Sequence, residues 1–195
     1  MYQVVGNTNT RTFRVLWAMH EMGLEFEHID APARSPEVLA VNPSGKVPAL
    51  IVDGTPIIDS VAILTYLADK HGKLTFPAGT IERAQQDSFT NLILDEFDAV
   101  LWMAARHSFV LPAEHRMKEI KDSLRWEFAR SIKLIEQRMS EGPNLMGEAF
   151  TIPDIILTQI GSWARVSKFD VPDGKLKEYF RSQIKRPAYI AASAT

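Results

Sequence analysis

The stretch NPSGKVPALIVDG, residues 42–54, places a proline directly before an apolar run that has the pattern of a buried strand. Pro48 has no N–H to donate to a sheet, so it fits the first residue of a strand, an edge strand or a bulge. Turn-forming residues precede it, and the Asp53-Gly54 pair after the run is typical of a hairpin turn. The stretch therefore predicts a strand over 49–52, a hairpin, and an exposed backbone where the chain enters that hairpin.

The residues around this hairpin alternate between strand and helix patterns. Strands are predicted at 2–5, about 25–30, 49–52 and 56–58. Helices are predicted at about 11–22, at 35–40, and from a cap at Asp59 or Ser60 to Gly72. The polar loop GNTNT, residues 6–10, separates the first strand from the first helix. The order up to Gly72 is β-α-β-α-β-β-α, which indicates a small α/β domain.

The character of the sequence changes after the stretch LTFPAGT, residues 74–80, which has the proline and glycine of a linker. Beyond it the apolar periodicity is helical, and no segment has a convincing strand pattern. Helices are predicted from about 81 to 106, from about 113 to 139, from about 152, and from about 174. The chain is therefore divided into an α/β domain at 1–73, a linker at 74–80 and an all-helical domain at 81–195.

The stretch FTIPDIILTQIGSWA, residues 150–164, begins with a capping box. Thr151 is the expected N-cap and Asp154 the residue that reaches back to it. No charge occurs from Ile155 to Ala164, so this helix is expected to be buried almost all round. A catalytic role for Asp154 is the alternative, but the capping pattern favours a structural one.

Composition excludes several classes of function. The chain has 195 residues, a formal net charge of -2 and a pI near 6.2, which offers no bulk attraction for nucleic acid or an anionic membrane. It has no cysteine, so any thiol chemistry must use a thiol that the protein borrows. The five histidines show no metal-ligand spacing, and no metal is expected. No apolar run is long enough for a membrane span and no secretory signal is apparent, so we expect a cytoplasmic protein.

The chain resembles the cytosolic glutathione transferases in four features. They are the β-α-β-α-β-β-α unit, the stretch NPSGKVPAL, the helix DSVAILTYLADKHG and the buried helix that begins with TIPD. The loop NTNTRTFRV is similar to that of bacterial members with a small polar residue at the activating position. The resemblance covers essentially the whole chain. It implies a thioredoxin-like domain followed by a helical bundle, homodimers, and detoxification by conjugating glutathione, the co-substrate, to a small hydrophobic electrophile.

The resemblance also implies a glutathione site. The Val47–Pro48 bond would be cis, leaving the Val47 backbone to pair with the cysteinyl part of glutathione as an added strand does. Ser60 and the helix N-terminus would bind the γ-glutamyl carboxylate, and Asp59 would accept from the γ-glutamyl ammonium. Lys46 would reach the glycyl carboxylate or a backbone group of the ligand. The alternative is that Asp59 and Ser60 only cap the helix and that Lys46 is solvated.

The family's activating serine falls near Asn9 or Thr10, and neither residue is a serine. Thr10 keeps a hydroxyl and Asn9 offers an amide, either of which can stabilise a thiolate by donating to it. Thr8 is a third possible donor to the thiolate. The alternative is that these residues only form the loop and cap the helix, and take no part in catalysis. Tyr2 begins its strand instead of ending it, which makes it a poor substitute for the catalytic tyrosine of other classes.

Trp102, Arg106 and His107 lie late on the first long helix, which lines the electrophile pocket in the family. We expect them either to form walls of that pocket or to belong to the core. Two other functions remain open. One is a glutathione-dependent peroxidase or disulfide reductase, and the other is a binding module that keeps the fold without the chemistry.

Overall fold

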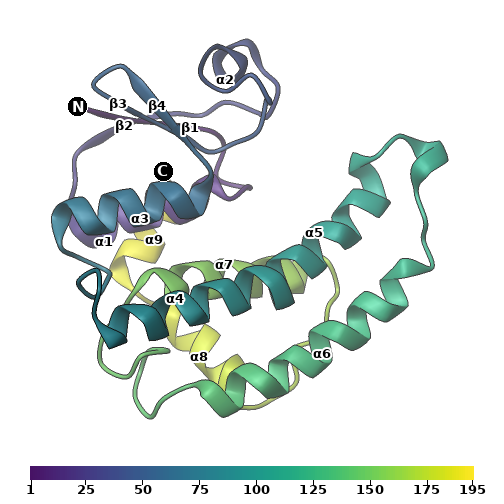
Figure 1. Ribbon diagram of the computed structural model, residues 1–195. Coiled ribbons are helices and arrows are strands. Elements are labelled where there is room, and N and C mark those ends of the chain that lie inside the picture. The colour runs from purple at the N-terminus through teal and green to yellow at the C-terminus, as the bar shows by residue number, and fades with distance from the viewer. The chain divides into compact units, whose positions relative to one another are not determined.

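The computed structural model describes residues 1–195, which form two compact units (Figure 1). The first unit contains Met1–Arg83 and Ile184–Thr195, and the second contains Ala84–Gln183. The residues after Gln183, which the sequence pattern groups with the helical domain, thus pack in the first unit. None of the helices combines the length and the apolar composition needed to cross a membrane.

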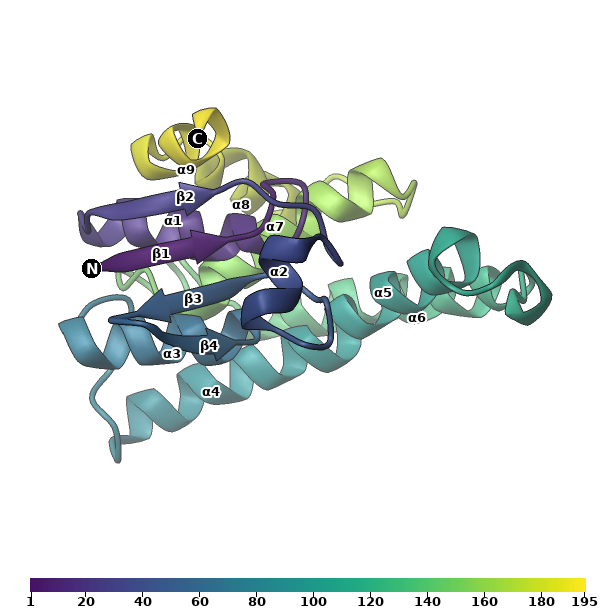
Figure 2. The same cartoon turned by 90° about the horizontal axis from the view of Figure 1, so that it is seen from above.

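A four-stranded mixed sheet forms the centre of the first unit (Figure 2). Its strands are β1 (Tyr2–Val5), β2 (Phe26–Ile29), β3 (Ala49–Val52) and β4 (Thr55–Ile58). Their order in the sheet is β2-β1-β3-β4, with β1 parallel to β2 and both other pairs antiparallel. This is the predicted thioredoxin-like arrangement, and the proline of the opening stretch directly precedes β3, as expected.

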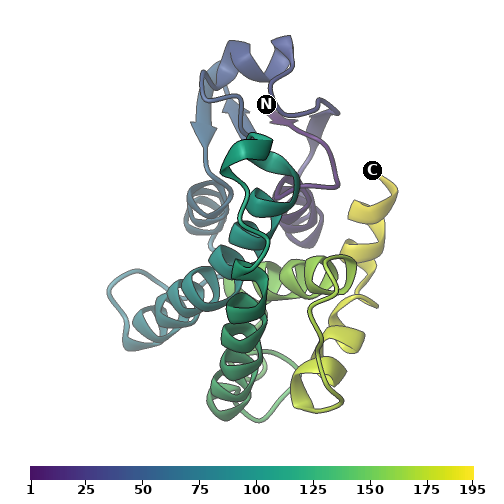
Figure 3. The same ribbon diagram turned by 90° about the vertical axis from the view of Figure 1, so that its right-hand side faces the viewer.

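Helices cover both faces of this sheet, because successive side chains of a strand point to opposite faces. The helices are α1 (Thr12–Met22), α2 (Pro36–Val41) and α3 (Ser60–His71). Val5 and Ala49, which pair across β1 and β3, form a buried cluster with Val38 of α2. Figure 3 shows α1 and α3 side by side on the opposite face, toward which Val4 and Leu50 point.

The strand register brings three connecting segments to one end of the sheet. Val5 pairs with Ala49, and Ala49 pairs with Ile58. The loop that leaves β1, the segment that enters β3 and the start of α3 after β4 therefore lie at the same end. Tyr2 and Val52, which pair with each other, mark the opposite end.

The second unit is helical, as predicted. It contains most of α4 (Ile81–Ile93), followed by α5 (Ala99–Ala105), α6 (Ile120–Arg138), α7 (Ile152–Val166) and α8 (Lys175–Gln183). Two π-helical segments, η1 (Leu94–Asp98) and η2 (Arg106–Val110), flank α5, so the predicted helix from 81 to 106 is continuous but not regular. Phe97, Phe128 and Phe169 stack edge to face in the core, with ring centroids 5.3 and 5.4 Å apart.

The helix predicted from about 113 begins later, at Ile120. Only a short 3-10 turn, η3 (Ala113–His115), forms near the expected start. The following Arg116 turns its guanidinium back to the carbonyls of Leu111 and Phe109, at 2.7 and 3.2 Å. These local bonds satisfy carbonyls at the end of η2, which lack partners further along a helix, and they hold the chain in a loop.

The capping box at the start of α7 is confirmed. The Asp154 carboxylate accepts from the Thr151 N–H at 2.8 Å, from the Thr151 hydroxyl at 3.0 Å, and from the Leu145 N–H at 2.8 Å. Tyr179 of α8 donates its hydroxyl to the same carboxylate at 2.8 Å. Burial raises the pKa of Asp154, while these donors oppose the rise. The residues from Ile152 to Ile160 and Ala164 are buried, whereas Gly161, Ser162 and Trp163 are half-buried, so the uncharged run is buried over most of its length but not all round.

A last helix, α9 (Pro187–Ala194), is absent from the predicted elements. Pro187 is its first residue, where a missing N–H is tolerated. The ring of Tyr189 lies 5.0 Å from the rings of both Phe13 and Trp17 of α1. Arg186 also forms an ion pair with Glu21 of α1, at 2.6 Å. These contacts explain why the C-terminal residues belong to the first unit.

Candidate functional site

The segment entering β3 offers an unpaired stretch of backbone. The Val47–Pro48 bond is cis, as the resemblance implied. The Asn42 side chain shapes the preceding turn, since its amide donates to the Lys46 carbonyl at 2.8 Å and its oxygen accepts from the Ser44 hydroxyl at 2.8 Å. The N–H and C=O of Val47 have no hydrogen-bond partner within the chain. An extended peptide can therefore pair with this residue.

The start of α3 lies at the same end of the sheet and has the features of an anion site. Asp59 caps the helix, because its Oδ1 accepts from the N–H groups of Val61 and Ala62 at 2.9 and 3.1 Å. Ser60 is 2% exposed, and its buried Oγ has no hydrogen-bond partner. A buried hydroxyl without a partner calls for a ligand or water. Its position at a helix N-terminus favours an anionic group.

The loop between β1 and α1 contains the candidates for thiol activation. The Thr10 hydroxyl donates to the Asn7 carbonyl at 2.8 Å, and its oxygen accepts from the Thr12 N–H at 3.1 Å. Because a hydroxyl has one proton, Thr10 has none left to donate to a sulfur. Asn9 is exposed and Thr8 half-buried, and the side chains of both have no hydrogen bond within the chain. The geometry therefore favours Asn9 or Thr8 as the donor, with Thr10 as a residue that shapes the loop.

Gly6 begins this loop and packs against Val47, to whose backbone an extended peptide can dock. The sequence analysis did not single out this glycine. Its φ of +134° lies in a region that residues with a Cβ rarely adopt. A Cβ placed there would collide with the Thr12 hydroxyl and would lie 2.8 Å from the Val47 Cβ. The sequence signal is a glycine directly after a strand, which often marks a close approach of two backbone segments.

Comparison with known proteins agrees with this geometry. The family model "Glutathione S-transferase, N-terminal domain" matches residues 11–70. Glutathione S-transferase GstA of Escherichia coli O157:H7 is 29% identical over 140 residues, which cover 69% of this chain and 65% of GstA. A glutathione transferase from Methylococcus capsulatus superimposes over 100% of this chain and 98% of its own, with a TM-score of 0.86 and 25% identity.

Residues 11–70 thus match a glutathione S-transferase N-terminal domain, and the whole chain has the fold of a glutathione transferase. A homologue from Sulfitobacter, solved with bound glutathione, has the same fold, with a TM-score of 0.86 at 22% identity and coverage of 100% and 97%. The chain spans less than two thirds of the length of GstA. The family model begins after the candidate loop residues Thr8, Asn9 and Thr10, and it covers α1, β3 and most of α3. It thus includes Lys46, Val47, Pro48, Asp59 and Ser60.

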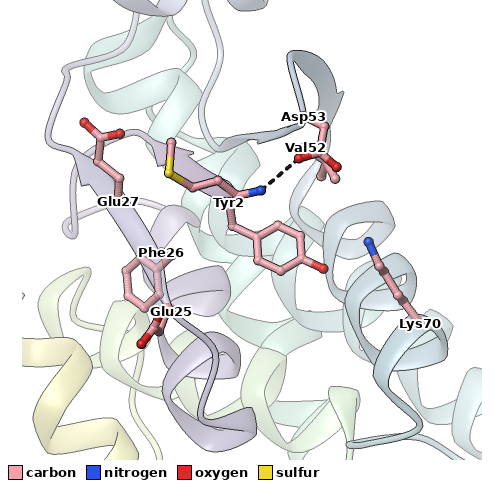
Figure 4. Close-up of a pocket in the computed structure, with 8 residues that line it drawn as sticks. Tyr2, Glu25, Phe26, Glu27, Val52, Asp53 and Lys70 are labelled. Carbon is pink, nitrogen blue, oxygen red and sulfur yellow. Dashed lines mark hydrogen bonds and ion pairs between the residues drawn. The ribbon is translucent and has the colours of Figure 1, made fainter.

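A separate pocket lies at the opposite end of the sheet from the candidate glutathione transferase site (Figure 4). It has a volume of about 530 Å³, and its walls include Tyr2, Phe26 and Lys70. Its polar groups bond to neighbours in the same unit: the Lys70 ammonium donates to the Tyr66 hydroxyl at 3.0 Å, and the Tyr2 hydroxyl lies 2.9 Å from His71 Nε2. None of the predicted site residues lines this pocket, and Tyr2 lies at the opposite end of the sheet from the candidate site.

The residues predicted to line an electrophile pocket lie in the second unit. Trp102 is on α5, and Arg106 and His107 are in the π-helical segment η2. All three are half-buried, and His107 Nδ1 accepts from the Met117 N–H at 3.0 Å. π-Helical segments are frequent at functional sites. No cluster of three or more histidine, aspartate or glutamate side chains that could hold a metal ion occurs in the structure.

Proposed function

We propose that this protein is a glutathione transferase that binds glutathione at the end of its sheet and activates it as a thiolate for attack on a small hydrophobic electrophile. The observation that carries the proposal is the buried, unpartnered hydroxyl of Ser60, at the same sheet end as the free Val47 backbone. Together they match the two ends of a γ-glutamyl-cysteinyl unit: a carboxylate for the helix N-terminus and a peptide for the backbone.

Each part of the site has a role in this proposal. The peptide of the cysteinyl residue pairs with Val47, which Pro48 presents, and the γ-glutamyl carboxylate accepts from the Ser60 hydroxyl. Asp59 uses only one carboxylate oxygen as a cap, which leaves the other for the γ-glutamyl ammonium. Lys46 is exposed and free of ion pairs, and its ammonium pairs with the glycyl carboxylate.

The chemical step needs the sulfur as an anion. The free thiol has a pKa near 8.5, so lowering it by about one to two units makes the thiolate abundant at neutral pH. In the proposal the Asn9 amide donates to the sulfur, and the start of α1 lies nearby. The thiolate then attacks the electrophilic carbon, the C–S bond forms, and the leaving group departs with its electron pair. The proton lost by the thiol passes to solvent.

We assign the electrophile to a pocket contributed by the helical domain, with Trp102, Arg106 and His107 as wall residues. In this proposal the protein acts as a cytoplasmic homodimer in detoxification. Residues 1–73 form the glutathione-binding domain, 74–80 the linker and the residues from 81 to Gln183 the helical domain, while Ile184–Thr195 pack with the first unit. Two observations favour a second candidate, a module that binds glutathione without conjugating it. The Thr10 hydroxyl already donates its proton to the Asn7 carbonyl, and no serine occurs at the position of the family's activating serine.

Titrating the ultraviolet thiolate absorbance of bound glutathione tests the proposal. In the wild type the pKa of the bound thiol is expected to fall about one to two units below that of the free thiol. Asn9→Ala is expected to return the pKa most of the way, because the amide donor is gone, whereas Asn91→Ala in the second unit leaves it unchanged. Binding without a lowered pKa supports the binding module, and activity with peroxides supports the peroxidase. The absence of glutathione binding contradicts the transferase and the peroxidase, and favours an interaction module that has kept the fold and lost the ligand.

Ser60→Ala is expected to weaken glutathione binding about 10- to 100-fold, because a hydrogen bond to a charged group contributes about 1.5–3 kcal/mol. Isothermal titration calorimetry measures the change. The variant is not expected to lose stability, since the hydroxyl has no partner within the chain. Ser193→Ala, at an exposed position of α9, is the matched control. A destabilised Ser60→Ala variant with unchanged affinity would show that Ser60 is only structural.

A further inference from the structure

A histidine outside the predicted site holds the start of the loop between β1 and α1. His28 is half-buried on the edge strand β2, paired in register with Val4 of β1. Its Nε2 lies 2.7 Å from the Gly6 carbonyl oxygen. A carbonyl oxygen can only accept, so Nε2 carries the proton and the imidazole donates.

Strand β2 therefore fixes Gly6 through both of its peptide groups. The Gly6 N–H donates to the Ile29 carbonyl at 3.0 Å, which continues the parallel pairing by one residue. The Gly6 carbonyl, which points out of the ladder after β1 has ended, is bound by the His28 ring instead. Side chains alternate between the two faces of β2, and this alternation places His28 on the same face as Phe26. Phe26, on the same face, contacts His20 of α1 at 5.3 Å between ring centroids, so this face of β2 is the one that α1 covers.

The position of Gly6 determines where the following residues can lie. Gly6 has no room for a Cβ, because the Thr12 hydroxyl and the Val47 side chain occupy that space. The next residue, Asn7, accepts from the Thr10 N–H at 3.3 Å and from the Thr10 hydroxyl at 2.8 Å, which closes a turn. Thr8 and Asn9 are the residues between them, so a shift of the Gly6 carbonyl rotates the peptide that carries this turn.

We propose that His28 is a positioning residue of the glutathione site: its hydrogen bond to the Gly6 carbonyl sets the loop that carries Asn9 at the distance needed to donate to the bound sulfur. This inference rests on the proposed function. His28 touches neither the ligand nor the sulfur. Its main effect is on the thiolate and not on the Ser60 anion site, because the start of α3 is held by its own cap. A misplacement of about 1 Å at a reacting group can cost up to about 100-fold in rate.

A pair of substitutions separates the hydrogen bond from the bulk of the ring. Gln places an amide N–H near the position of Nε2, whereas Met has a similar length and no donor. His28→Met is expected to raise the pKa of the bound glutathione thiol by about half a unit or more and to lower kcat/KM about tenfold. Its Kd for glutathione is expected to stay within about twofold of the wild type, since Ser60 and Val47 remain. His28→Gln is expected to restore the thiol pKa, and His20→Leu on α1 is the matched control without effect.

Amide hydrogen exchange over residues 6–12 provides a readout that needs no ligand. In His28→Met this exchange is expected to be about tenfold faster, with β3 and α3 unchanged. Unchanged exchange, or faster exchange with an unchanged thiol pKa, overturns the positioning role. A thiol pKa that His28→Gln does not restore also overturns it. If the wild type binds no glutathione, the proposed function fails together with the effect on sulfur, and the exchange alone decides whether His28 holds the loop. Should His28→Met not fold, His28→Leu, closer to the ring in volume, takes its place.

Discussion

Replacing Asp154 with alanine is expected to lower the free energy of unfolding by about 3–5 kcal/mol, as is typical when one partner of a buried charged network is removed. The carboxylate is 0% exposed and accepts four hydrogen bonds. Two of the donors are backbone N–H groups, of Leu145 and Thr151, which cannot turn toward other partners. In Asp154→Ala both are left buried without an acceptor, and each such group costs about 1–3 kcal/mol. The Tyr179 hydroxyl loses its shorter hydrogen bond and keeps only the carbonyl oxygen of residue 154, at 3.4 Å, as an acceptor on α7.

Urea denaturation followed by circular dichroism measures this loss. Asp170→Ala is the matched control, because Asp170 is exposed and takes part in no hydrogen bond or ion pair, so its change is expected within about 0.5 kcal/mol. Asp154→Asn is expected to lie between the two: one oxygen remains, but the new NH₂ group faces the Thr151 N–H. A loss below about 1 kcal/mol in Asp154→Ala would contradict a stabilising role for the network.

The sequence predicts those parts of the structure that local chemistry decides. The hairpin of β3 and β4 follows from a proline before an apolar run and an Asp-Gly turn after it, and α3 follows from its cap and its apolar stripe. The capping box of α7 needs only residues three positions apart in the chain. In each case the contacts that decide the structure lie within a few residues of one another.

The parts that the sequence does not predict depend on contacts between distant residues. Tyr189 of α9 packs on Phe13, and no local pattern links these two positions. The hydrogen bond of Thr10 to Asn7 is short in range, but a hydroxyl has several possible acceptors, and only the path of the loop decides among them. The site was therefore predicted as residue types at one sheet end, whereas the residues that hold its loop in place were not.

An alanine at position 6 is expected to lower the free energy of unfolding by about 3 kcal/mol or more and to weaken glutathione binding. Two costs add. A φ of +134° is strained for any residue with a Cβ, at about 1–3 kcal/mol, and overpacking costs about 1–3 kcal/mol more. The new methyl group collides with the Thr12 hydroxyl and the Val47 side chain. Because Val47 is the residue to which glutathione docks in the proposed function, relief of this overlap moves the docking backbone itself.

Gly72→Ala separates the two costs. Gly72 ends α3 at a φ of +61°, and nothing lies within 4 Å of a Cβ built there. Its substitution is expected to cost about 1–2 kcal/mol from the backbone alone and to leave glutathione affinity unchanged. Urea denaturation and titration calorimetry on both variants give the comparison. Equal losses of stability, with affinity preserved in Gly6→Ala, would mean that the loop and Val47 move independently. A larger loss with weakened binding in Gly6→Ala alone would mean that the activating loop and the docking backbone are built as one unit around a position that only glycine can occupy.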